Sequence, residues 1–541
     1  MKRTRSTIIM CAIVAVAASW TCWEMQVNAK PLTIVGVSGP DVIVGHIPSA
    51  TRWGTTNGET SYSIGTTSCN IGDEVFDWIA STNVHPVISQ NLYRVADGRI
   101  EQLGQSWLKH GFAVAAGNFC GQCTIPAGNA LHPGCSDPYG SGLNGNQSLL
   151  GPKSQVNAST GFFPYPHTDL PQSGTLDGRI RVPNVDIEPA SNPGARYFVE
   201  SEYIHPQDSA AGNSANNASY REVSFSGNNL NMNMVGATRQ QQPAINAWQQ
   251  VHDDVRLFNV DIPGDGRVVV GVRITPNGTG GFRTDVAIEN LTSHRSVRSM
   301  ALTFGNDKTS KPGFNDVDYQ FEQYTDSDWT PTLNGNTVEW ATGTNVNTAN
   351  AIRWNTLYSF WCDSETCPEE ISLGMLRPGT PTNIAVEIPA IESPATGMNV
   401  FRGVQLGGAL ADISQSDDSY VRFNPGFTLN GSEAPISLIF DASLQGGTSC
   451  LNFAVESNAN TPGLTSTTEA FNWNTNVFDV IGTAAESFNT DTVTNSDLAG
   501  SIDDHVSPNG NVLARVGWRQ TGFTLIFPWE VRVDSVMWTS R

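Results

Sequence analysis

Short apolar runs separated by polar turns, rather than long helical stripes, dominate the sequence. Four successive runs have the length and the β-branched content of strands, and sequences such as Pro263-Gly-Asp-Gly266 separate them at the spacing typical of β-sandwiches. The four runs are residues 255–262, 267–274, 283–290 and 297–304. Further strands are expected at 337–340 and 383–388. The pattern therefore predicts one β-sandwich over residues 245–428.

The preceding region, residues 30–244, combines short strands with long polar loops. Strands are expected at residues 32–37, 41–44 and 197–204. Asp97-Gly98 lies between two strand-like runs, which is a strong signal for a β-hairpin. Residues 126–195 are rich in Pro, Gly, Asn and Ser, and the cysteines nearby favour an ordered loop draped over the domain. We therefore predict a loop-rich β domain.

The last module, residues 429–541, begins with strand-like residues 436–440 and resumes that pattern at 512–526. Near the C-terminus, Val531, Val533, Val536 and Trp538 change their spacing from two residues to three and back. Side chains alternate strictly along a regular strand, so this slip indicates a β-bulge. The predicted fold class is mainly β and multi-domain, with β-sandwich modules following a loop-rich β domain that contains a Cys/His cluster.

Length and charge narrow the possible partners. A chain of 541 residues is expected to form about three or four domains. The formal net charge is −21, with 30 Lys and Arg against 51 Asp and Glu. Such a field repels nucleic acids and anionic lipids, so we expect no nucleic-acid partner. Abundant carboxylates could bind Ca²⁺, but a soluble acidic surface explains them more simply.

The N-terminal residues have the pattern of a signal peptide. Lys2, Arg3 and Arg5 precede an apolar run at 8–18, and Val27-Asn-Ala29 carries small residues where a signal peptidase cleaves. We predict a signal peptide over residues 1–29 and a secreted or cell-surface protein; an uncleaved anchor and a lipoprotein are the alternatives. Nothing after it approaches about 18 uninterrupted apolar residues, so no membrane span is expected after cleavage.

Export makes disulfides the default state of the cysteines. Seven cysteines follow the predicted cleavage site, and an odd number leaves at least one thiol free unless it pairs between chains. The disulfide candidates are Cys69, Cys120, Cys123, Cys135, Cys362 and Cys367. The four-residue spacing between Cys362 and Cys367 favours a bridge that closes a small loop. Pairings among the four N-terminal cysteines stay open.

The same N-terminal cluster also permits metal binding. Cys120-Gly-Gln-Cys123 with His132 and Cys135 offers four nitrogen or sulfur ligands of the kind that zinc prefers. His85, His110 and His132 are the candidate metal-binding histidines, although a structural role is the simpler interpretation of His85 and His110. Asp261 and Asp265 flank glycines in a possible Ca²⁺ loop that a tight turn explains equally well. The cofactor is therefore unknown, with Ca²⁺ or a transition metal as options.

Seven phrases of the sequence stand out together, at residues 41–45, 65–72, 85–93, 106–112, 135–139, 216–221 and 351–360. They resemble a family of large secreted β-rich proteins of environmental bacteria that has no assigned activity. The resemblance covers most of residues 40–400. It implies a secreted β-rich protein and supplies no catalytic residues.

Catalytic motifs are absent or unconvincing: G-x-S-x-G, H-E-x-x-H and P-loop sequences do not occur. We expect an exported protein of binding or structural type, with surface polysaccharide or another extracellular protein as partner. Some of the 14 Trp could stack on sugar rings. The alternative is a secreted, metal-dependent hydrolase or oxidase with its site in residues 67–140. The sequence leans away from an enzyme and leaves the question open.

Overall fold

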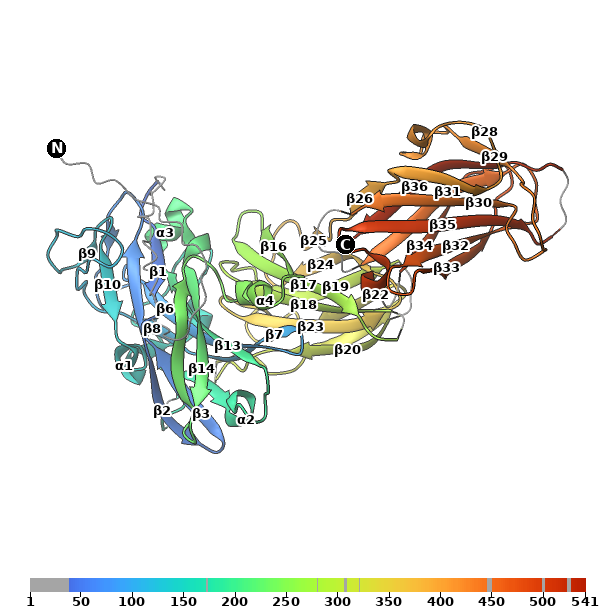
Figure 1. Cartoon of the computed structure of the whole chain (residues 1–541). Helices are drawn as coiled ribbons and strands as arrows, with labels where there is room; N and C mark the ends of the chain where they lie inside the picture. Colours follow the sequence, from blue (N-terminus) through green and yellow to red (C-terminus); the bar gives the residue numbers. More distant parts are fainter. Residues whose placement is uncertain are drawn as a thin grey trace, which may run out of the picture. The chain divides into compact units, whose positions relative to one another are not determined.

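The computed structural model describes residues 38–171, 174–279, 281–305, 309–320, 322–444, 450–498, 502–522 and 527–541. The predicted signal peptide and the predicted strand at 32–37 lie outside these residues. Among the described residues, strands form eight sheets and the helices are short, so the mainly β fold class is confirmed (Figure 1). None of the helices described reaches the length and hydrophobicity that a membrane crossing requires.

The N-terminal region contains a seven-stranded sheet, two three-stranded sheets and a two-stranded sheet. The predicted hairpin forms between β6 and β7, with Ala96 opposite Arg99 and with Asp97 and Gly98 both at positive φ. Two such residues make the type I′ turn that suits the strand twist. The strands of the seven-stranded sheet are β6 (Val87–Ala96), β7 (Arg99–Gln105), β8 (Leu108–His110), β11 (Leu150–Gly151), β13 (Arg196–Ile204), β14 (Ala218–Ser226) and β15 (Asn231–Arg239).

The smaller N-terminal sheets hold the cysteine-rich loops. Their strands are β1 (Val42–His46), β4 (Thr66–Asn70) and β10 (Ser136–Tyr139); β2 (Ala50–Thr56), β3 (Glu59–Ile64) and β12 (Ile180–Pro183); and β5 (Phe76–Asp77) with β9 (Ala130–Leu131). The short helices are α1 (Ser141–Asn144), α2 (Asn184–Ile187), α3 (Pro206–Ala211), α4 (Ile245–Val251) and α5 (Ile502–His505). Single 3₁₀ turns are η1 (Gln147–Leu149), η2 (Lys153–Gln155), η3 (Ser214–Asn216) and η4 (Leu410–Ile413). The described part of residues 126–195 thus contains several short elements.

The middle sandwich consists of two five-stranded sheets, and the four successive strands predicted for it are confirmed. One sheet has the order β16 (Arg256–Asp261), β17 (Arg267–Pro276), β18 (Phe282–Asn290), β23 (Leu357–Ser364), β20 (Thr309–Asn315). The other has the order β21 (Thr330–Asn334), β22 (Thr337–Ala341), β19 (Val297–Phe304), β24 (Pro368–Met375), β25 (Asn383–Glu387).

The β17 strand is apolar on both faces. Val268, Val270 and Val272 face the core between the two sheets, whereas Val269 packs in a second cluster with Trp248 of α4 and Tyr93 of β6. This double burial explains why the sequence runs through three consecutive valines instead of alternating with polar residues. The outer face of this sheet is therefore covered by the N-terminal region.

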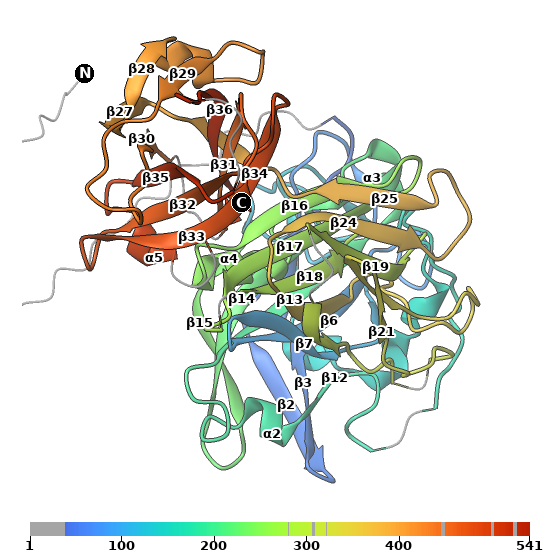
Figure 2. The same ribbon diagram turned by 90° about the vertical axis from the view of Figure 1, so that its right-hand side faces the viewer.

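The C-terminal sandwich also has two sheets (Figure 2). One contains β28 (Val404–Gly407), β29 (Val421–Asn424), β36 (Val531–Ser540), β31 (Leu451–Ala459) and β34 (Thr492–Asp497), with β26 (Ile391–Pro394) beside β36. The other has the order β27 (Gly397–Arg402), β30 (Ile436–Ser443), β35 (Asn511–Gln520), β32 (Leu464–Asn472), β33 (Val477–Ala485).

Within residues 391–424, β26, β27 and β29 pair with strands that begin at or after residue 436, and β28 pairs with β29. The sequence placed 391–428 with the middle sandwich, so the sheet pairing differs from the predicted boundary between 428 and 429. The strands β26, β27 and β28 are short and mostly exposed, which leaves little hydrophobic pattern to reveal their partners. The predicted bulge in the last strand is confirmed: Glu456 lies opposite Ser535 and Ser457 opposite Val533, so Asp534 is the extra residue.

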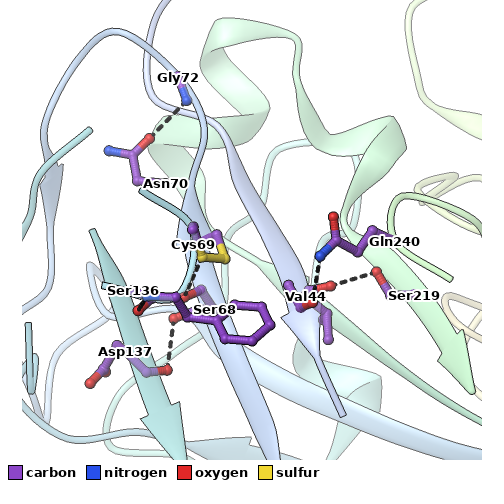
Figure 3. The surroundings of a disulfide bond; sticks show 12 residues. Val44, Ser68, Cys69, Asn70, Gly72, Ser136, Asp137, Ser219 and Gln240 are labelled. Atoms are coloured by element: carbon purple, nitrogen blue, oxygen red, sulfur yellow. Dashed lines mark hydrogen bonds between the residues drawn. A yellow bond between two sulfur atoms is a disulfide. The ribbon is translucent and has the colours of Figure 1, made fainter. Parts of the chain in front are cut away.

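Three disulfides occur in the described residues: Cys69–Cys120, Cys123–Cys135 and Cys367–Cys450. Figure 3 shows the surroundings of Cys69, where the Ser68 hydroxyl donates to the carbonyl of Asp137 at 3.2 Å and thus joins β4 to β10. The predicted bridge between Cys362 and Cys367 is wrong. Cys362 is a free, buried thiol in β23 whose side chain belongs to the sandwich core, and burial raises its pKa to about 12.

Candidate binding groove on the C-terminal sandwich

His85 is held as a structural residue. Its ring is 2% exposed, and its two nitrogens lie against the carbonyl oxygens of Pro86 (2.7 Å from Nδ1) and Phe112. Burial lowers its pKa to about 4, outweighing these carbonyl contacts, so the imidazole is neutral at pH 7. Gly111 lies flat on the ring, where any Cβ would come 2.0 Å from Cε1. This packing leaves no room for a ligand on that face.

His110 and His132 are not brought to His85 as metal ligands. The buried ring of His110 packs against His167, Phe163 and Tyr165, with centroids 4.6, 5.7 and 5.8 Å away, and burial lowers its pKa to about 3. His132 is half-buried and contributes its carbonyl oxygen to the amide of Cys135 at 3.0 Å. In the part of the chain that the structure describes, no group of three possible metal ligands includes a histidine.

The other two predicted metal sites also have structural explanations. Cys120 and Cys123 belong to different disulfides, so neither offers the thiolate that zinc requires. The 261–267 segment is a tight turn, in which the Ile262 amide donates a hydrogen bond to the Gly266 carbonyl at 2.7 Å and Asp261 forms an ion pair with Arg267. Asp265 accepts hydrogen bonds from Ser293, His294 and Arg295 and so braces a neighbouring loop.

A surface groove of about 440 Å³ lies on the C-terminal sandwich instead. It lies over the outer face of the sheet formed by β27, β30, β35, β32 and β33. Figure 2 shows the arrangement of these strands. The volume is within the range of about 300–1,000 Å³ that small-molecule sites occupy. Its lining residues are Phe401, Arg402, Ser432, Glu433, Ala434, Ser437, Thr467, Glu469, Arg515, Gly517 and Arg519.

The floor of the groove follows from strand register. Ser437, Gly517 and Thr467 lie side by side on β30, β35 and β32, and they present small side chains or none. A Cβ at Gly517 would approach the methyl group of Ala434 at 2.9 Å, so glycine lets the loop close over this row. The next outward row contains Arg515 and Glu469, whose long side chains form a wall. The row of short side chains therefore forms a hollow beside the row of long ones.

Charged pairs and an aromatic ring line the walls. Arg515 binds Glu469 through two hydrogen bonds of 2.5 and 2.6 Å, and Arg402 lies 3.2 Å from Glu433. The Arg515 guanidinium lies 4.4 Å from the centroid of Phe478 and 6.0 Å from that of Phe401. Phe401 is 56% exposed, although burial would stabilise a side chain of its size by about 2 kcal/mol. The groove thus offers fixed donors and acceptors beside an exposed apolar face.

Two other hollows are less suited to a ligand. A cleft of about 320 Å³ lies between the N-terminal region and residues 315–320, but no aromatic ring lines it. A cavity of about 20 Å³ beside Arg353 and Arg377 is large enough for a water molecule or two. The groove on the C-terminal sandwich combines volume, an aromatic ring and organised polar groups.

The groove could not be found from hydrophobic alternation. The inward residues of β32 include Ser466, Thr468 and Asn472, so this strand lacks the apolar pattern that marked the others. Thr465, Thr467 and Glu469 alternate with those residues at a period of two. Because both faces of this strand carry polar residues, its sequence does not reveal which face is exposed.

Known proteins resemble this chain at low identity and low TM-score. No family model and no curated protein matches the chain. Among solved structures, the xylan-binding module CBM15 is 14% identical, with 28% of this chain and 96% of that module covered and a TM-score of 0.19. The CBM22-1–CBM22-2 tandem domain of Paenibacillus barcinonensis Xyn10C is 9% identical, covering 53% and 91%, with a TM-score of 0.20.

An infectious bursal disease virus structure (Gx strain) is similar to the same degree, at 10% identity, coverage of 53% and 70%, and a TM-score of 0.17. Carbohydrate-binding modules and a virus thus give comparable scores. At these identities and TM-scores the likenesses carry no argument about a ligand or an activity. The case for a binding site rests on the groove itself.

Proposed function

We propose that this is an exported, non-catalytic binding protein whose groove on the C-terminal sandwich takes a polysaccharide chain. The observation that carries the proposal is the exposed Phe401 beside the Arg515–Glu469 and Arg402–Glu433 pairs in an open groove. A sugar ring has apolar faces that pack on an aromatic ring and hydroxyls at its rim that meet planar donors and acceptors. An open groove, unlike a closed pocket, accepts an internal stretch of a long chain.

Export is supported by the three disulfides, since such bridges form and persist in oxidising compartments. We expect N-terminal sequencing of the mature protein to begin at Lys30. Thiol titration should find one thiol per mature chain, Cys362, which reacts only after denaturation because it is buried. A reduced protein with seven titratable thiols would contradict export.

The binding test is a glycan array followed by calorimetry of the whole mature protein with the best polysaccharide. Phe401→Ala should weaken binding about tenfold to hundredfold, which corresponds to about 1.5–3 kcal/mol of lost apolar contact. Phe427→Ala is the matched control, because this ring is 84% exposed in the same sandwich and does not line the groove. Binding should survive that change.

Two results would overturn the proposal: an array blank for neutral and acidic polysaccharides alike, or binding that Phe401→Ala and Arg515→Ala leave unchanged. Consumption of the glycan would show an enzyme. The enzymatic alternative at residues 67–140 gains no support from the described residues, since His85, His110 and His132 do not converge there. We therefore advance no second function.

A further inference from the structure

The bulge in β36 gives Asp534 an unusual position. In a regular strand Asp534 would alternate with its neighbours, but the extra residue turns its side chain out of the ladder. It faces Asp418, in the loop before β29, and Asp491, immediately before β34. One carboxylate oxygen from each of the three residues lies within 4.8 Å of the other two. Segments from three parts of the chain thus converge on one point.

Neighbouring groups fix two of the three carboxylates. Asp491 accepts hydrogen bonds from the Tyr420 hydroxyl at 2.7 Å and from the Asn458 amide at 2.6 Å. Tyr420 also lies 3.4 Å from Asp418. The backbone amides of Asp417 and Asp418 point to the Asp534 carboxylate. Asp418 itself is exposed and has a positive φ of 63°, which orients this turn toward the bulge.

One oxygen in this arrangement lacks a partner. Asp534 is 1% exposed, yet its Oδ1 accepts no hydrogen bond from any described residue. The Oδ1 of buried Asn458 is likewise unpartnered. An ionised oxygen buried without a donor or a cation is destabilising. Glu456 and Asp491 add further negative charge near Asp534.

We infer that Asp418, Asp491 and Asp534 bind a Ca²⁺ ion. Ca²⁺ takes six to eight oxygen ligands at about 2.3–2.6 Å, so two of its ligands lie at most about 5 Å apart, as these oxygens do. All the donors are hard oxygens, which disfavours zinc and copper. Asp418 lies on an exposed loop and can adjust, which suits Ca²⁺ better than the strict octahedron of Mg²⁺. Water completes the coordination on the exposed side.

The ion would tie the loop before β29 and the start of β34 to the last strand. It lies outside the groove lining, so the inference stands independently of the proposed function. A site built from three carboxylates and water, on an exported protein, falls in the dissociation-constant range of about 10⁻⁴–10⁻³ M of extracellular Ca²⁺ modules. Such a site is filled in Ca²⁺-rich surroundings and released by chelators.

The test uses the mature protein stripped with EGTA and dialysed. Calorimetry with CaCl₂ should give one site in that range, and 10 mM Ca²⁺ should raise the unfolding temperature by about 3–8 °C. Mg²⁺ at the same concentration should give a smaller shift. Asp418→Asn is the primary variant, because the side chain is exposed and its loss leaves the fold intact. We expect it to weaken Ca²⁺ binding at least tenfold.

Asp491→Asn should abolish the Ca²⁺ shift, whereas Glu392→Gln, an exposed acid on β26 of the same sandwich, should leave it unchanged. If Asp491→Asn fails to fold, the Asp418→Asn result decides. No Ca²⁺ shift in the wild type up to 10 mM overturns the inference, as does an equal shift in the wild type, Asp418→Asn and Asp491→Asn. Glycan binding is measured separately, so failure of either proposal is distinguishable from failure of the other.

Discussion

Two clusters of three carboxylates among the described residues are built in opposite ways. In the first, Glu200 and Glu202 of β13 and Glu289 of β18 are fully buried, and each of their six oxygens accepts a hydrogen bond. In the second, Asp418, Asp491 and Asp534 face one another at the edge of a sandwich, and an oxygen of Asp534 has no donor among the described residues.

The difference lies in what compensates the charge. Asn355 donates to both Glu200 and Glu202 at 2.9 and 2.8 Å, and Lys153 lies next to it. Burial first, and then the charge of Glu200, raises the pKa of Glu289 and of Glu202. Bound protons and amide donors therefore compensate the negative charge of this cluster. The aspartates have fewer donors and lie at the surface, where an ion can enter. The glutamate cluster, whose oxygens all accept hydrogen bonds, joins two regions of the fold. The aspartate cluster, in which one oxygen has no donor among the described residues, supports the proposed ion.

The largest expected effect is loss of the Asn355 side chain. Asn355→Gly removes the one donor to Glu202 Oε2 among the described residues and should lower the free energy of unfolding by about 3 kcal/mol. Asn355→Ala should be about 1 kcal/mol worse, because the residue has a φ of 54°. Urea unfolding measures both. Asn57→Gly, an exposed residue with a φ of 53°, is the control and should change stability by less than about 0.5 kcal/mol.

A smaller effect should appear as pH dependence. The raised pKa of Glu289 means that its protonated form stabilises the fold below about pH 4.5, and that this contribution is lost as pH rises toward the folded pKa. Glu289→Gln mimics the protonated carboxyl. The stability difference between wild type and variant should therefore change by up to about 1.4 kcal/mol per pH unit between pH 5 and 7.

Buried His85 and His205 each have a pKa lowered to about 4, so their contribution to stability rises with pH, opposite to that of Glu289. Because both histidines are present in the wild type and in the variant, this contribution cancels in the difference. Glu392→Gln, which changes an exposed acid, should leave the wild-type pH profile unaltered. Parallel stability curves for the wild type and Glu289→Gln would contradict the assignment of a proton to this cluster.

The smallest effect concerns the aspartates without Ca²⁺. Asp534→Asn removes one of three facing charges and keeps an oxygen for the amides of Asp417 and Asp418. In EGTA we expect the variant to be about 1 kcal/mol more stable than the wild type, and in 10 mM Ca²⁺ less stable than it. Chemical unfolding in EGTA and in 10 mM Ca²⁺ measures whether the order of stability of the variant and the wild type reverses. A variant that is less stable in EGTA as well would show that the carboxylates do not repel one another.

The fold followed from the sequence where burial imposes a pattern. Strands β16 to β19 and the bulge at Asp534 were legible because valines mark the inward positions. No such apolar pattern marks either cluster of carboxylates, so neither cluster could be predicted from the sequence. Glu200 and Glu202 alternate as surface residues would, and only the packing of β13 against another region buries them. Asp418, Asp491 and Asp534 are separated by long stretches of chain, and only the folded sheet brings them together.

Cysteine pairing was likewise beyond sequence spacing, because Cys367 bonds to a partner 83 residues away and not to its near neighbour. That bridge spans the exposed Pro389-Ala390 connection between β25 of the middle sandwich and β26 of the C-terminal one. A protease that cuts this connection would leave both sandwiches covalently joined. Release of the C-terminal sandwich therefore requires two events, peptide cleavage and disulfide reduction, because either one alone leaves the two sandwiches covalently joined.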